Sequence, residues 1–259
     1  MKTLFNKYEG TGNDFIIVRN SPAVMDHSDR LLIKKLCDRR FGIGADGLML
    51  IEECDGYDFR MAYFNADGSP GAMCGNGARC AAHFAMSNFA GFRDLSFMAD
   101  DGPHTAKHAG NDIIEVSISD VTEVREAPDG LLVNTGVPHL VAFTDNNEDV
   151  DMVSFGRSLR YSARYAPEGV NVNLVSVTDG KLMVRTYERG VEDETLSCGT
   201  GVTASAIAAA ITGKIVTSSP VVSVRGGTLS VRFELAGKGA SHIFLTGPAT
   251  FVFAGEIEI

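Results

Sequence analysis

The sequence predicts an α+β protein with two pseudo-symmetric lobes, each a mixed or antiparallel sheet wrapped around a central helix. The first observation is that Cys74-Gly-Asn-Gly77 and Cys198-Gly-Thr-Gly201 each open an Ala-rich apolar segment typical of a buried helix. The second is that strands, a helix, a hairpin, a cysteine helix and further hairpins follow one another twice. We therefore expect a tandem duplication, with a lobe over residues 1–122 that carries Cys74 and a lobe over 123–249 that carries Cys198. A strand over 250–259 is expected to pack back onto the first lobe.

The first half contains short apolar segments separated by turns rich in Gly, Asn and Asp, a pattern typical of strands. The expected strands cover residues 4–8, 14–19, 48–52, 57–64, 95–99, 105–108 and 113–119. Apolar spacing predicts a helix over 29–40, and the first cysteine helix is expected to reach about residue 89. The Gly42–Gly47 segment matches G-x-G-x-x-G, but a helix precedes it and a strand follows. A dinucleotide site needs the opposite order, so we interpret this segment as a loop that shapes a cleft wall.

The second half repeats this order of elements. The expected strands cover residues 131–134, 140–143, 170–177, 181–188, 221–225, 228–234, 242–245 and 251–253. A helix is expected over 151–161, and the second cysteine helix from residue 198 to about 212. Ala and Gly dominate both cysteine helices, which indicates close packing against a surrounding sheet.

Composition limits the classes of partner. The chain of 259 residues is 44% hydrophobic and 22% charged, with a net charge of −10 and a pI of about 5.0. This acidity argues against nucleic acid and anionic membrane surfaces, which need a basic face. No apolar run approaches the roughly 20 residues of a membrane span, and the N-terminal stretch has no signal-peptide core, so we expect a cytoplasmic protein. Its five cysteines form no C-x2-C pair and are expected to be free thiols, without bound metal.

The two cysteines at the helix starts are the candidate reactive groups. Free backbone N–H groups and the helix dipole favour negative charge there, so the thiol pKa of Cys74 and Cys198 is expected to fall. For Cys37, Cys54 and Cys80 we favour a structural role as small apolar residues. Two matching thiols in a cleft between the lobes suggest that both act on one substrate atom.

Two thiols on opposite faces of a carbon can invert it, because one removes a proton and the other delivers one. The negative charge that develops on a substrate α-carboxylate needs stabilisation. The N–H groups of Gly75, Asn76, Gly199 and Thr200 are the candidates for holding that carboxylate.

Several other polar residues occupy strand ends and turns, and each has two interpretations. Arg189, after Glu188, either binds a second carboxylate bidentately or forms a surface ion pair. His139 either polarises a thiol or caps a strand. The three asparagines either fix turns or donate to a polar substrate, and they are Asn13, Asn65 and Asn171.

At these positions the sequence resembles the diaminopimelate epimerase family. The matching pieces are, in chain order, Gly12-Asn-Asp-Phe15, Phe41-Gly-Ile-Gly-Ala-Asp46, Asn65-Ala-Asp-Gly-Ser69, Cys74-Gly-Asn-Gly-Ala-Arg79, Gly136 with Pro138-His139, Val170-Asn171-Val172, Glu188-Arg-Gly190, and Glu194-Thr195 with Cys198-Gly-Thr-Gly201. The resemblance implies an isomerase without pyridoxal or metal that interconverts LL- and meso-diaminopimelate, a small diamino dicarboxylic acid of lysine and cell-wall precursor biosynthesis. It also implies a homodimer.

The resemblance further assigns roles to residues. Cys74 and Cys198 would be proton acceptor and donor, assisted by His139 and Glu188. Gly75, Asn76, Gly199 and Thr200 would hold the reacting carboxylate through their amides. The distal end of the substrate would be held by Asn13, Asn65, Asn171 and Arg189.

The chain departs from the family pattern at a few positions. Val137 stands where many members have Asn, Gly47 where some have Gln, and the segment from Arg189 to Thr195 is one residue longer. These departures leave the two thiols intact and motivate one alternative, a related two-thiol racemase acting on another amino acid such as histidine. Two alternatives of other classes are a thiol–disulfide oxidoreductase, which lacks a C-x-x-C motif here, and a binding module without catalysis.

Overall fold

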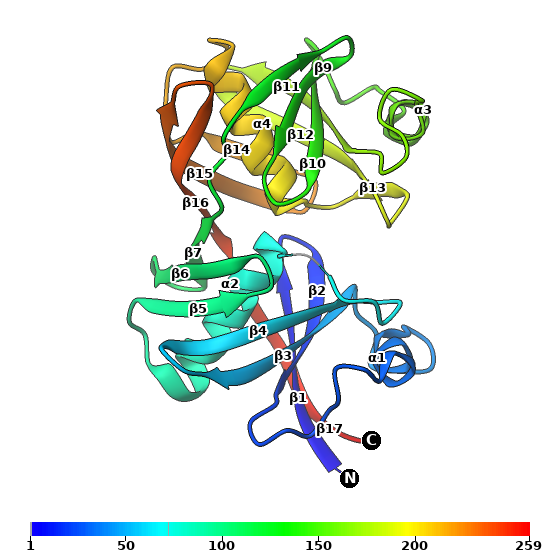
Figure 1. Cartoon of the computed structure of the whole chain (residues 1–259), viewed down its shortest axis with the longest axis vertical. Helices are drawn as coiled ribbons and strands as arrows, with labels where there is room; N and C mark the ends of the chain where they lie inside the picture. Colours follow the sequence, from blue (N-terminus) through cyan, green and yellow to red (C-terminus); the bar gives the residue numbers. More distant parts are fainter. Residues whose placement is uncertain (1, 72) are drawn as a thin grey trace. The chain divides into compact units, whose positions relative to one another are not determined.

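The computed structural model describes residues 2–71 and 73–259 and divides into two compact units (Figure 1). The first comprises Met1–Val116 with Gly247–Ile259, and the second comprises Ser117–Thr246. The division falls inside strand β7 (Ile113–Ile118), earlier than the boundary at residues 122 and 123 in the sequence prediction. A continuous strand carries the chain from one unit to the next, so turn-forming residues do not mark the division.

The first unit consists mainly of strands, with two helices. Its elements are β1 (Lys2–Gly10), β2 (Asn13–Arg19), α1 (Arg30–Cys37), β3 (Gly47–Cys54), β4 (Tyr57–Asn65), α2 (Gly75–Ala85), the π-helical turn η1 (Met86–Ala90), β5 (Leu95–Ala99), β6 (Gly102–His108), the first part of β7, and β17 (Thr250–Glu258). Strand β17 pairs antiparallel with β1, so the C-terminal segment completes this unit.

The second unit has the same kinds of elements in the same order. They are β8 (Val124–Ala127), β9 (Gly130–Asn134), β10 (Pro138–Phe143), α3 (Met152–Arg160), β11 (Asn171–Thr178), β12 (Lys181–Glu188), β13 (Asp193–Thr195), α4 (Gly199–Ile211), β14 (Val221–Val224), β15 (Gly227–Ala236) and β16 (Gly239–Pro248).

The strand pairing confirms the predicted duplication. Along β1-β2-β3-β4-β5-β6 the pairings are antiparallel, parallel, antiparallel, parallel and antiparallel. Along β9-β10-β11-β12-β14-β15 the same succession occurs. In both units a helix connects the first parallel pair, as a parallel crossover requires.

The two cysteine helices form the centre of their units. Every residue of α2 is buried, and α4 is buried from Gly199 to Ala209. Helix α2 packs against β1 to β4 and β6, and α4 packs against β9 to β12 and β15. Small Ala and Gly side chains allow this close approach, because larger groups would clash with the surrounding strands. Helices α1 and α3 cover the outside of the strands in Figure 1.

Helix α1 is shorter than the predicted span of 29–40. It begins after Asp29, whose carboxylate accepts the backbone N–H of Leu32 at 3.0 Å. It ends at Cys37, because the carboxylate of Asp38 accepts the N–H groups of Arg40 and Phe41 at 2.7 and 2.8 Å and closes a turn instead. In the described part of the chain, no helix has the length and apolarity needed to cross a bilayer.

Candidate active site

Cys74 occupies the N-terminal end of α2 in the first unit. It is the N-cap residue, in extended conformation at φ −112° and ψ 114°, and its carbonyl oxygen accepts the N–H of Ala78 at 2.7 Å. The amides of Gly75, Asn76 and Gly77 lie in the first turn, where no intrahelical carbonyl is available to them. The thiol therefore lies at the positive end of a helix dipole, as the sequence predicts.

Asn13 connects this thiol to a charged cluster. Its Oδ1 lies 3.7 Å from Cys74 Sγ and accepts Nδ2 of Asn76 at 3.4 Å, while its own Nδ2 donates to Asp46 Oδ2 at 2.7 Å. A carboxylate only accepts, so Asp46 fixes the amide with Oδ1 toward the thiol. Asp46 is in turn bound by Arg39 at 2.7 Å. Asn13 thus contacts the sulfur directly, and its role at the distal end of a substrate stays a prediction.

Asn65 and Gly47 meet at the paired ends of β3 and β4. The Asn65 Nδ2 donates to Ser69 Oγ at 3.2 Å and its backbone N–H to Ser69 O at 2.9 Å, so in this structure the residue fixes a turn. A Cβ on Gly47 would lie 2.5 Å from Cε2 of Tyr63. The departure from the family pattern at Gly47 therefore makes room for the Tyr63 ring.

Cys198 repeats the arrangement of Cys74 in the second unit. It is the N-cap of α4 at φ −123° and ψ 105°, and its carbonyl accepts the N–H of Val202 at 2.9 Å. The amides of Gly199, Thr200 and Gly201 occupy the first turn. The two cysteine backbones thus differ by about ten degrees in each dihedral angle, so both thiols sit in the same local geometry.

His139 reaches Cys198 through one intermediate residue. Its Nε2 lies 3.0 Å from Thr200 Oγ1, and that hydroxyl lies 3.5 Å from Cys198 Sγ. Complete burial lowers the pKa of His139 to about 3, with a smaller contribution from the positive charge of Arg189. The imidazole is therefore neutral near pH 7 and is too weak a base to take the thiol proton.

Glu188, Arg189 and Asn171 lie together where β12 ends and β11 begins. Asn171 Oδ1 accepts the backbone N–H of Arg189 at 2.8 Å, and Arg189 Nη1 donates to the carbonyl of Glu168 at 3.3 Å. Asn171 is also opposite His139 in the parallel pairing of β10 and β11. These three predicted residues therefore belong to one region near His139, and their contacts with substrate stay predictions.

Asn173, Thr186 and Asp46 support the candidate site, although none of them was predicted as a site residue. Asn173 Nδ2 donates to His139 Nδ1 at 3.1 Å, and Asn173 Oδ1 accepts the hydroxyl of Thr186 at 2.9 Å. A signal for Asn173 was present, because residues two apart on a strand share a face and Asn171 was already a candidate.

The remaining cysteines lie away from helix starts. Burial raises the pKa of Cys37 to about 12 and raises that of Cys80 further, so both thiols stay protonated near neutral pH. Cys54 is half-buried at the end of β3. Within residues 2–71 and 73–259, no group of three His, Cys, Asp or Glu side chains is arranged to hold a metal ion.

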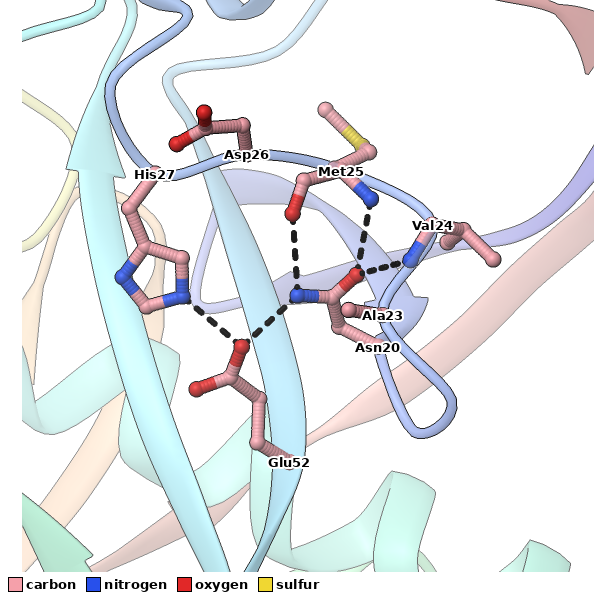
Figure 2. Close-up of a pocket in the computed structure, with 7 residues that line it drawn as sticks. All are labelled: Asn20, Ala23, Val24, Met25, Asp26, His27 and Glu52. Carbon is pink, nitrogen blue, oxygen red and sulfur yellow. Dashed lines mark hydrogen bonds and ion pairs between the residues drawn. The ribbon is translucent and has the colours of Figure 1, made fainter.

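A separate hollow of about 480 Å³ lies in the first unit and is lined by the 20–27 loop and Glu52 (Figure 2). Asn20 Oδ1 accepts the N–H groups of Val24 and Met25 at 2.8 and 2.9 Å. Glu52 Oε1 lies 2.7 Å from both Asn20 Nδ2 and His27 Nε2. These polar groups bind one another, so we interpret the cluster as an anchor that holds the loop to β3.

Comparison with known proteins gives consistent matches. The family model described as diaminopimelate epimerase matches residues 5–122 and 131–252. A diaminopimelate epimerase of Flavobacterium psychrophilum is 47% identical over 97% of this chain and 98% of its own length. One from Chlorobaculum tepidum is 39% identical over 96% of this chain and 99% of its own length. A crystal structure of a PhzF-family phenazine biosynthesis protein from Bacillus anthracis has a TM-score of 0.75 at 14% identity and full coverage of both chains, which shows the fold alone.

Proposed function

Because the chain belongs to the diaminopimelate epimerase family, we propose that it interconverts LL-2,6-diaminopimelate and meso-diaminopimelate with Cys74 and Cys198 as its two acid–base groups. The enzyme is an isomerase of lysine and cell-wall precursor biosynthesis. The observation that carries the assignment of these residues is that both cysteines cap buried helices in the same backbone geometry.

The proposed reaction moves one proton at each thiol. A thiolate on one face of the substrate takes the Cα proton and becomes a thiol, while the electron pair of the C–H bond moves toward the carboxylate. The opposing thiol then donates its proton to the other face of the carbon and becomes a thiolate. The configuration is inverted, and the reverse direction uses the two cysteines in exchanged roles.

The N-terminal ends of α2 and α4 can stabilise the negative charge that develops on the substrate α-carboxylate. We propose that the first-turn amides of Gly75, Asn76, Gly199 and Thr200 hold the α-carboxylate, because first-turn N–H groups of a helix point toward its N-terminal end. Donors fixed in advance stabilise developing charge without reorganisation. We propose that the distal carboxylate binds Arg189, because a guanidinium presents paired N–H donors to a carboxylate. The assistance of Glu188 and contacts from Asn13, Asn65 and Asn171 belong to the same proposal.

A deuterium wash-in assay tests the substrate. The protein is incubated in D2O with LL-diaminopimelate and, separately, with L-histidine. We expect deuterium at Cα and formation of the meso isomer with diaminopimelate only. The matching relatives are named as diaminopimelate epimerases, so the histidine racemase alternative is not favoured. Exchange with histidine and none with diaminopimelate would overturn the proposal.

Three accompanying properties are also part of the proposal. Catalysis by thiols and amides needs no cofactor, so dialysis against a chelator should leave turnover unchanged. A cytoplasmic location suits five cysteines in the thiol form. We also propose a homodimer, which exposed apolar residues on β17 support. These residues are Phe251, Val252 and Phe253. Light scattering of the wild type and of Val252→Lys tests the assembly, and an unchanged monomeric mass in both would contradict it.

A further inference from the structure

A buried polar cluster lies behind Cys198 on the strands that surround α4. Its members His139, Asn173 and Thr186 are 0%, 0% and 3% exposed and come from β10, β11 and β12. Buried polar groups in an Ala-rich core are costly unless their hydrogen bonds are complete. Neither Asn173 nor Thr186 is among the residues that the resemblance identifies, so their presence needs its own explanation.

The orientation of the Asn173 amide is determined by its partners. One of them is the carbonyl oxygen of Leu140, 3.1 Å away, which only accepts. The nitrogen of the amide must therefore face Leu140. The Asn173 Oδ1 then accepts the hydroxyl of Thr186 at 2.9 Å, and both ends of the amide are satisfied in this orientation.

This orientation also fixes the proton on His139. Asn173 Nδ2 is a donor and lies 3.1 Å from His139 Nδ1, so that ring nitrogen must accept. The neutral imidazole then carries its proton on Nε2, which donates to Thr200 Oγ1 at 3.0 Å. Because the hydroxyl oxygen accepts this bond, the hydroxyl proton is available to point at Cys198 Sγ, 3.5 Å away.

We propose that Asn173 is a positioning residue, which acts through His139 and Thr200 to fix a directed chain of hydrogen bonds that ends on Cys198 and stabilises its thiolate. This inference rests on the proposed role of Cys198 as an acid–base group. Each bond in the chain donates toward the sulfur. The chain therefore favours negative charge on the sulfur without placing a formal positive charge beside it.

The surroundings of His139 keep the chain neutral. The neighbouring strands β9 and β11 and helix α4 contain no charged side chain, and the nearby end of β12 carries Glu188. Arg189, which follows Glu188, acts on His139 through its positive charge. Arg189 opposes protonation of the imidazole, as does burial. The direction of the hydrogen bonds therefore persists over the pH range in which a thiol titrates.

Nitrogen NMR of the histidines tests the direction of the chain in the unaltered protein. The protein is labelled with 15N-histidine, and the His139 signals are identified by their absence from a His139→Gln sample. We expect a protonated Nε2 and an unprotonated Nδ1 in the wild type. A protonated Nδ1 would overturn the proposal, and this readout needs no altered variant to fold.

Thiol alkylation tests the effect on the sulfur. The rate of iodoacetamide labelling is followed against pH, with peptides of Cys198 and Cys74 quantified separately by mass spectrometry. Thr200→Val removes the hydroxyl and should raise the apparent pKa of Cys198 by about one unit. At pH values below this pKa, the thiolate fraction should then be roughly tenfold smaller. Thr200→Ser keeps the hydroxyl and should restore the wild-type value. The Cys74 profile should be unchanged in both.

Asn173→Ala tests the far end of the chain, with Met49→Ala as the control at the corresponding position of the first unit. We expect Asn173→Ala to raise the apparent pKa of Cys198 and Met49→Ala to leave it unchanged. An unchanged Cys198 profile in either Thr200→Val or Asn173→Ala would overturn the proposal. The deuterium assay on the wild type is independent of these results. Failure of the proposed hydrogen-bond chain can therefore be distinguished from failure of the epimerase function.

Discussion

The two cysteine helices begin alike, but the strands behind them differ in chemistry. A Cβ on Gly77 of α2 would meet Met49 Sδ at 3.2 Å and Phe15 Cε1 at 3.5 Å. A Cβ on Gly201 of α4 would meet Asn173 Oδ1 at 2.3 Å and His139 Cε1 at 3.3 Å. An apolar pair therefore backs the first helix, and a hydrogen-bonded pair backs the second. The duplicated backbone preserved the position of each thiol, while substitutions behind it gave each thiol its own environment.

A second difference lies five residues after each cysteine. In α2 this residue is Arg79, fully buried, whose guanidinium bonds to the carbonyls of Gly75 and Pro248 at 3.3 and 3.2 Å. Burial lowers its pKa to about 10, so it stays a cation near neutral pH. In α4 the residue is Thr203, which bonds to Gly199 O at 3.0 Å. The first thiol thus shares its unit with a buried charge, and the second depends on neutral dipoles.

Removal of either sulfur should have the largest effect. Cys74→Ser and Cys198→Ser should each reduce epimerisation on the order of 10²–10⁴-fold, because a serine hydroxyl is a much weaker acid than a thiol. Steady-state assays in both directions measure this. Cys54→Ser, at the end of β3, is the matched control and should retain wild-type turnover. Near-normal activity in one of the helix-start variants would break the proposed equivalence of the two thiols.

Replacing Gly77 and Gly201 by alanine should change the free energy of unfolding by different amounts. Gly201→Ala should destabilise by about 1–3 kcal/mol, since its Cβ would overlap a buried amide oxygen that cannot move freely. Gly77→Ala meets the end of a flexible methionine, and its better helix propensity should make it neutral or slightly stabilising. Urea unfolding compares the two. An equal loss of unfolding free energy in the two variants would indicate that the packing behind the two helices is equivalent.

Arg79→Met should affect the first thiol selectively. The positive charge of Arg79 interacts with Cys74, so its removal should raise the apparent pKa of Cys74 by about one unit while Cys198 stays constant. Alkylation against pH, resolved by peptide, measures both in one sample. A shift at Cys198 of equal size would indicate a general loosening of the fold.

His139 should make the stability of the folded protein sensitive to acid. Its pKa is about 3 in the folded protein and 6.5 as a free side chain, so the unfolded state binds the proton first as the pH falls. Stability is therefore fully present above pH 6.5 and decreases toward pH 3, by at most about 1.4 kcal/mol per pH unit. His139→Phe, which installs the residue type of Phe15, should flatten this slope in urea titrations at pH 7 and pH 5. An unchanged slope would assign the sensitivity to another group, such as His83, whose pKa burial also lowers.

Much of the fold was predictable, because its regular elements have strong local signals. Both cysteine helices and the main strands carry apolar patterns bounded by Gly, Asn or Asp. Strand β8 (Val124–Ala127) was missed because half of its residues face solvent and no alternation is visible. Strand β13 (Asp193–Thr195) was missed because it is entirely polar, and Glu194 is held by Arg185 at 2.7 Å. Such strands depend on tertiary partners that a local pattern does not reveal.

The positions of the two cysteines at helix starts were predictable, because the local sequence determines where those helices begin. A cysteine before Gly-x-Gly and a small-residue helix indicates a helix start by itself. The support for each thiol was less visible, because Asn173 and Asp46 act through side chains from other strands and loops. The contact of Asn13 with Cys74 was not foreseen, since the position of its amide depends on Asp46, and its role at the distal end of a substrate stays a prediction.

Strand β17 has a consequence for how the chain folds as it is made. The place beside β9 is filled by β8, its neighbour in sequence, whereas the equivalent place beside β1 is filled by Thr250–Glu258. On the ribosome, residues 117–246 can complete their sheet as soon as they emerge. The half that is translated first must keep one edge of β1 open until Thr250–Glu258 have been synthesised, and open edges are sites of aggregation. Chaperone protection during synthesis would therefore matter most for the first unit, which is made first and whose β1 edge is paired last.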